Sequence, residues 1–310
     1  MRKILAYVLR HHREHYDRKL YLTIALFLAI CIAVNYWLNF EDDIIDPFHG
    51  KPIKWLWLFL FQAFPFIGVC FILYAFGKCR NWLTDREFWL KLVICMGLLA
   101  LDRSFYGWDT VFKGIPYSHA YFMIRCLNRL SGFIIIVLPL LLIGHWLEKE
   151  DKRYGLQWHK FDYKPYLQLL AIAGVLIGIG SFLSELNQYY PRYLKSGAGA
   201  FLNAYPDIPK SFTVIAYELA YGSDFISVEM IFRGFMILAF TRTLGGYAVF
   251  PMVAAYAFLH FGKPVSETIS SVFGGYVLGV ITLYSRNIWG GVLIHLGIAW
   301  LMELFGWLHQ

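Results

Sequence analysis

Two charged residues, Glu229 and Arg233, stand in a largely apolar stretch of the sequence, residues 211–240, which also holds Glu218 and Asp224. Their spacing of four places them one turn apart on the same face of a helix, where they can form an ion pair. A charge at bilayer depth costs about 2.5–3.5 kcal/mol, so each one needs a partner or a function. Taken alone, the pair is as consistent with a structural ion pair as with catalysis.

Two histidines, His260 and His295, lie in separate apolar runs that follow this stretch. Imidazole can position a water, bind a metal or stabilise an oxyanion. A single histidine in an apolar helix is more often a packed core residue, but two of them after a Glu-x-x-x-Arg helix indicate a site. Hydrolysis of a peptide bond inside a membrane needs an activated water, a base and donors for the tetrahedral intermediate. We therefore take Glu229, Arg233, His260 and His295 as candidate catalytic residues.

The same residues leave the question of a cofactor open. His260, His295 and Glu229 could supply three ligands of a catalytic divalent metal such as zinc. They could equally form a metal-free site in which a glutamate acts as the base.

Three motifs in this region resemble those of a known family. Residues 228–234, Val-Glu-Met-Ile-Phe-Arg-Gly, are similar to the first motif, Glu-Glu-x-x-x-Arg, of the CPBP intramembrane endopeptidases (the CAAX protease and bacteriocin-processing, or Abi, family). Residues 256–260 resemble the second motif, Phe-x-x-x-His, and residues 295–299 the last, His-x-x-x-Asn. The resemblance implies a polytopic helical membrane protein that hydrolyses a peptide bond in a membrane-associated or lipidated substrate.

The chain departs from the family pattern at two functional positions. The first glutamate, which the family assigns as the base that activates water, is Val228, and the asparagine expected to help bind the oxyanion is Ala299. From the resemblance we expect Glu229 to accept the proton instead, with Arg233 keeping it charged. The other carboxylates that could reach the site are those of Asp224, Glu267 and Glu303.

The whole chain has the composition of a membrane protein. It is 58% hydrophobic and 16% charged, well short of the quarter or so that is charged in soluble domains. About 20 apolar residues cross a bilayer. Nine apolar runs are candidates for spans: residues 20–40, 55–76, 88–101, 131–147, 166–186, 211–240, 247–261, 265–284 and 288–308. The sequence thus predicts an all-α transmembrane bundle of eight or nine spans, with the aromatic segment 103–129 interfacial or re-entrant.

Charge and patterning divide this bundle into three parts. Residues 1–19 form a basic segment, residues 20–210 form N-terminal transmembrane helices that act as a scaffold, and residues 211–310 form the CPBP-like core. The net charge of +7 does not indicate nucleic-acid binding, because Lys and Arg lie in short segments between apolar runs. Their bias predicts a cytoplasmic N-terminus in the plasma membrane. We expect membrane lipid and a membrane-embedded or lipidated peptide as partners.

Two other functions remain open at this level. A catalytically silent relative could use the same fold to bind a partner or to confer immunity to a toxin peptide, and Val228 and Ala299 favour that alternative. A small transporter could also carry intramembrane Glu, Arg and His, although no internal repeat is detectable. The sequence does not reveal the substrate, the cleavage position or the oligomeric state.

Overall fold

The computed structural model describes residues 2–148, 153–158, 161–182 and 184–310, and these residues form helices and no strand. The predicted all-α class is therefore confirmed. The α-helices are α1 (Arg2–His15), α2 (Arg18–Leu38), α3 (Ile53–Ala75), α4 (Arg86–Ser104), α5 (Gly107–Val111), α6 (Tyr117–Gly132), α7 (Leu138–Leu147), α8 (Lys164–Gly180), α9 (Ser184–Tyr189), α10 (Ala198–Ala204), α11 (Lys210–Glu229), α12 (Thr241–Leu244), α13 (Val249–Leu259), α14 (Val265–Ser285) and α15 (Trp289–Leu308). Short π-helical and 3-10 segments join them: η1 (Glu41–Ile45), η2 (Asp46–Phe48), η3 (Arg80–Leu83), η4 (Phe133–Val137), η5 (Arg192–Lys195), η6 (Met230–Ala239) and η7 (Gly245–Ala248).

Five helices in the described part of the chain are long and apolar enough to cross a membrane, which supports a multi-pass membrane protein. They are Arg18–Leu38, Ile53–Ala75, Tyr117–Leu147, Val265–Ser285 and Trp289–Leu308. The expected count of eight or nine spans is not confirmed. The reason lies in the other helices, because α4 and α11 carry several charged residues and α13 has only 11 residues.

The segment 103–129 is largely helical, and its interfacial or re-entrant position stays a prediction. It holds the short helix α5, and α6 then continues through η4 into α7 as one helix, Tyr117–Leu147, of 31 residues. The apolar run 131–147 is therefore only the second half of a longer helix. Basic residues tolerate this position because they face protein partners, as Arg129 does in its 2.7 Å ion pair with Asp224.

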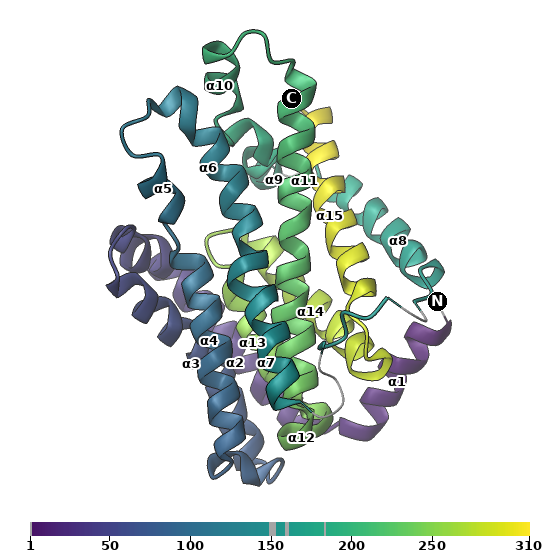
Figure 1. Ribbon diagram of the computed structural model, residues 1–310. Coiled ribbons are helices and arrows are strands. Elements are labelled where there is room, and N and C mark those ends of the chain that lie inside the picture. Colours follow the sequence, from purple (N-terminus) through teal and green to yellow (C-terminus); the bar gives the residue numbers. More distant parts are fainter. Residues whose placement is uncertain (1, 149–152, 159–160, 183) are drawn as a thin grey trace.

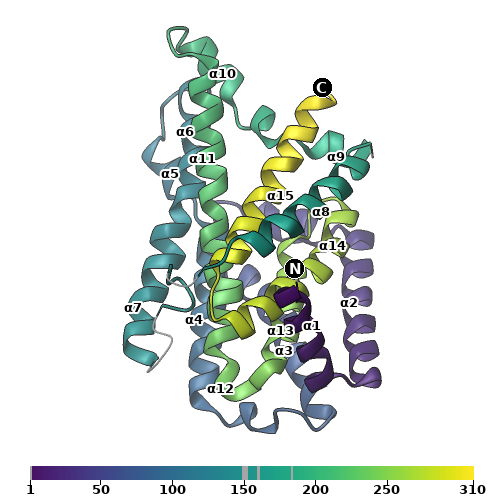
Figure 2. The ribbon, with the colours of Figure 1, turned by 90° about the vertical axis from the view of Figure 1, so that its right-hand side faces the viewer.

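Helix α11 runs through the middle of the bundle between α6 and α15, and α13 packs between α3 and α14 (Figures 1 and 2). Gly222, Ser223 and Asp224 could permit a break in a helix of this length, but α11 continues unbroken to Glu229. Gly222 serves packing instead: a Cβ there would lie 2.7 Å from Cδ1 of Leu296 on α15. This close approach brings the histidine-bearing helix α15 against α11.

A buried lysine fixes the far end of the same helix. Helix α11 passes directly into η6, and the Ala239 carbonyl near its end accepts a 2.9 Å hydrogen bond from Nζ of Lys91. The Lys91 ammonium also pairs with Glu87 at 2.8 Å and Glu148 at 2.7 Å. A buried charge is tolerated only with partners of this kind. The α11–η6 unit is thereby tied to α4.

Candidate active site

Glu229 and Arg233 form the ion pair that their spacing predicts. The Nη1 atom of Arg233 lies 3.0 Å from Oε1 of Glu229, and both side chains are completely buried at the junction of α11 and η6. The guanidinium also stacks on the ring of Tyr256, with 3.9 Å between its central carbon and the ring centroid. The aromatic face adds a second favourable contact for the cation.

His295 is held at both of its ring nitrogens. Its Nδ1 lies 3.1 Å from the same Glu229 oxygen, and its Nε2 lies 3.2 Å from the Tyr256 hydroxyl. A carboxylate only accepts hydrogen bonds, so we assign the proton to Nδ1, and Nε2 then accepts from Tyr256. Glu229 therefore fixes the tautomer and the orientation of the imidazole.

His260 ends helix α13 one turn after Tyr256. Its Nδ1 lies 3.0 Å from the Tyr256 carbonyl, which can only accept, so Nδ1 carries the proton and Nε2 keeps a lone pair. The Thr268 hydroxyl donates to the His260 carbonyl at 2.7 Å and ties this turn to α14. Tyr256 thus touches both histidines and Arg233, and it brings three of the four predicted residues together.

Both histidines line two adjoining cavities. The larger has a volume of about 250 Å³ and includes Val228 in its wall, and the smaller has about 110 Å³ and includes Arg233 and Ala299. The two positions that depart from the family pattern thus both face open space beside the histidines. Among the described residues that line these cavities Glu229 is absent, because it is buried behind His295.

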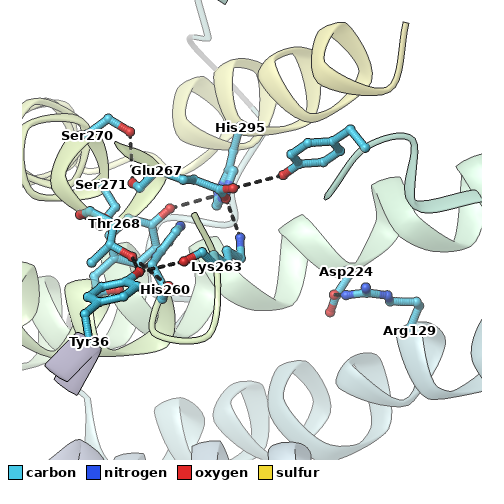
Figure 3. A network of polar contacts seen from close by, with 12 residues as sticks. Tyr36, Arg129, Asp224, His260, Lys263, Glu267, Thr268, Ser270, Ser271 and His295 are labelled. Atoms are coloured by element: carbon cyan, nitrogen blue, oxygen red, sulfur yellow. Dashed lines mark hydrogen bonds and ion pairs between the residues drawn. The ribbon is translucent and has the colours of Figure 1, made fainter. Parts of the chain in front are cut away.

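The other carboxylates considered from the sequence are already engaged. Asp224 lines the larger cavity but pairs with Arg129, as Figure 3 shows. Glu267 lines the smaller cavity and pairs with Lys263 at 2.6 Å (Figure 3). It also accepts a hydrogen bond from the Tyr190 hydroxyl at 3.2 Å. Glu303 accepts hydrogen bonds from two backbone amides, those of Arg192 at 2.6 Å and Tyr193.

The donor set does not fit a three-ligand metal centre. Within the described residues, no group of three or more His, Cys, Asp or Glu side chains is arranged to hold a metal ion. One carboxylate oxygen of Glu229, Oε1, faces Arg233 and the protonated Nδ1 of His295. A step through a metal therefore has no support in the arrangement of these residues.

Two polar groups at the site were not predicted from the sequence. The Tyr256 hydroxyl contacts His295, although Tyr256 was not among the candidate catalytic residues. Asp102, at the end of α4, lines the larger cavity together with Val228, His260 and His295. Only the packing of α4 against the π-helical segments brings Asp102 to the site, so no local sequence signal could have found it.

Comparison with known proteins supports the same part of the chain. Residues 215–301 match a protein family described as type II CAAX prenyl endopeptidase Rce1-like, and the match includes every motif position from Val228 to Ala299. Searches of curated proteins and of solved structures give no match. The resemblance carried by the three motifs is therefore confirmed, and this C-terminal part of the chain is similar to the CAAX proteases of the CPBP family.

Proposed function

We propose that the protein is an intramembrane endopeptidase that hydrolyses a peptide bond in a membrane-embedded or lipidated peptide. The observation that carries this proposal is the meeting of His260 and His295, from two different helices, at one cavity inside the segment that matches the endopeptidase family. A prenylated peptide is the substrate class that the family description suggests.

Each of the four predicted residues has a role in this proposal. His260 accepts a hydrogen bond from the attacking water through its unprotonated Nε2, and His295 holds the Tyr256 hydroxyl beside the same histidine. Glu229 keeps His295 in its tautomer, and Arg233 compensates the charge of Glu229. The proton acceptance first expected of Glu229 remains a prediction, and its burial between two donors favours the orienting role.

The position of the protein in the membrane belongs to the same proposal. We place it in the plasma membrane with residues 1–19 on the cytoplasmic side, where Lys and Arg accumulate. Residues 20–210 act mainly as scaffold for the core 211–310. The shorter or more charged helices α4, α8, α11 and α13 would supply the spans beyond the five long ones.

The test is cleavage of synthetic peptides by the purified full-length protein in lipid nanodiscs. Internally quenched peptides that end in Cys-aliphatic-aliphatic-X are offered with and without an S-farnesyl group. We expect wild type to cleave the farnesylated peptides, and we expect His260→Ala and His295→Ala to lower kcat by about 10²-fold or more, as loss of a positioned catalytic group does. The exposed His49 provides the matched control, His49→Ala, which should cleave like wild type.

Two results would contradict the proposal. Wild type could leave every peptide intact, in which case the catalytically silent relative, consistent with Val228 and Ala299, becomes the better hypothesis. Alternatively, both histidine variants could cleave at the wild-type rate, which would place the active site elsewhere in the chain.

A further inference from the structure

The carboxylate of Asp102 lies near Ser227, next to Val228, the position at which the family has its first glutamate. Gly132 on α6 marks the place: a Cβ there would lie 2.6 Å from Oγ of Ser227 and 3.8 Å from Oδ1 of Asp102. The absence of a side chain at Gly132 thus lets α4, α6 and α11 converge beside Ser227, the residue before Val228. Asp102 and Val228 line the same cavity as the two histidines.

The basic side chains of this cavity already contact groups other than Asp102. Arg103 pairs with Glu41, Arg129 pairs with Asp224, and Lys263 pairs with Glu267. The guanidinium of Arg192 stacks on the Tyr189 ring at 4.2 Å.

Asp102, by contrast, forms no side-chain hydrogen bond or ion pair with any residue that the structure describes. A half-buried carboxylate in a polar cavity without a protein partner is free to bond a water there. The other acidic groups near the histidines, Asp224, Glu229 and Glu267, each have a cationic partner.

Both negative and positive charges act on Asp102. The carboxylate of Asp224 repels it, while the guanidinium groups of Arg103 and Arg129 attract it. A carboxylate in this position can take up and release a proton during the reaction. The remaining charged or titratable groups around the cavity are His260, Lys263, His295, Arg192, Tyr189, Tyr190 and Tyr221.

We propose that Asp102 is the general base of the reaction and supplies from α4 the carboxylate that Val228 does not supply from α11. This inference rests on the proposed endopeptidase function. The carboxylate takes one proton from a water in the larger cavity, and the water oxygen bonds to the carbonyl carbon of the scissile peptide. The carboxylic acid so formed then gives that proton to the leaving nitrogen as the C–N bond breaks. The products are a carboxylic acid and an amine, and Asp102 returns to its charged form.

The experiment removes the carboxylate on α4 by Asp102→Asn and introduces a carboxylate on α11 by Val228→Glu. Asp102→Asn, Val228→Glu and the double variant are assayed with the farnesylated quenched peptides, next to His295→Ala and the control Asp207→Asn, which changes an exposed aspartate. We expect Asp102→Asn to lower kcat by about 10²–10⁴-fold with KM little changed. We expect Val228→Glu to restore much of that loss in the double variant, because its carboxylate enters the same cavity. The thermal midpoint and gel-filtration profile of each variant show whether it is folded.

The pH dependence of kcat gives a second, independent readout. In wild type kcat should rise with pH and then level off, because only the charged carboxylate accepts a proton, and Asp102→Asn should lack this rise. Wild-type kcat in Asp102→Asn, together with loss of activity in His295→Ala, overturns the role of Asp102 and leaves the endopeptidase function intact. A loss in Asp102→Asn that appears in KM alone and is not restored by Val228→Glu also overturns it. Failure of wild type on every peptide overturns both proposals.

Discussion

At the scale of single residues, the contact between Gly291 and Glu229 gives a sharp test of the orienting role. A Cβ at Gly291 would collide with Oε2 of Glu229, whose other oxygen is held by Arg233 and His295. We predict that Gly291→Ala displaces this carboxylate, lowers stability by about 1–3 kcal/mol as overpacking does, and lowers kcat at least tenfold. Thermal unfolding and peptide cleavage measure the two effects.

The control for this change is another glycine in a helix. Gly199 on α10 is exposed and would place a Cβ in open space, so Gly199→Ala should keep both stability and cleavage. Wild-type behaviour of Gly291→Ala would mean that Glu229 does not need its present position.

Some residues of the site could be predicted from the sequence and others could not. Glu229 and Arg233 were predictable as a pair because they share one helix face, and His260 and His295 because each is an unusual residue in an apolar run. Asp102 was not predictable, because a carboxylate at the end of an apolar run is ordinary. Its significance depends on Gly132 and on the convergence of three helices, which only the tertiary structure shows.

At the scale of elements, α1 is attached to the bundle through His11. This histidine is completely buried, its Nδ1 lies 2.9 Å from the Tyr276 hydroxyl, and its Nε2 lies 3.1 Å from the Gly246 carbonyl. Burial lowers the pKa of His11 to about 4. The unfolded or detached state titrates near 6.5, so the neutral histidine stabilises docking above that pH, and this contribution is lost as pH falls from about 6.5 towards 4.

We therefore predict that α1 detaches in acid before the rest of the bundle unfolds. Amide hydrogen exchange in Arg2–His15, corrected for intrinsic rates, should increase between pH 7.5 and pH 5, and His11→Gln should remove this dependence. The exposed neighbour His12 supplies the control, because His12→Gln should leave the dependence in place. Equal exchange at both pH values in wild type would contradict the prediction.

Elements were predictable in position more than in extent. Among the residues that the structure describes, each apolar run is mostly helical, because about 20 apolar residues in a row are stable in lipid only as a helix. Hydropathy could not show that the run 131–147 continues back to Tyr117, since the polar residues in between are satisfied by protein partners such as Asp224. Nor could it show that the glycine at position 222 serves helix contact and not a kink.

At the scale of the whole molecule, the predicted division into scaffold and core stays a prediction, but the cavity draws on both parts. Its wall includes Asp102, Arg129 and Tyr190 from before residue 210 as well as His260 and His295 from after it. The apolar pattern alone could not show this, because it treats each run separately. A core fragment of residues 211–310 would therefore lack much of the cavity.

Orientation in the membrane is the remaining property of the whole molecule, and it follows from charge. The segment 1–19 is more basic than residues 41–54, and the 21-residue helix α2 separates them, so we predict that residues 1–19 are cytoplasmic and residues 41–54 face outward. Single cysteines at the exposed positions His12 and His49, in a variant without the five native cysteines, report each side. A membrane-impermeant maleimide should label His49→Cys in intact cells and His12→Cys only after permeabilisation, whereas the cysteine-free protein should stay unlabelled. The reverse pattern would invert the topology, and labelling of both positions in intact cells would show that α2 does not span, because a helix that crosses the bilayer must separate its ends.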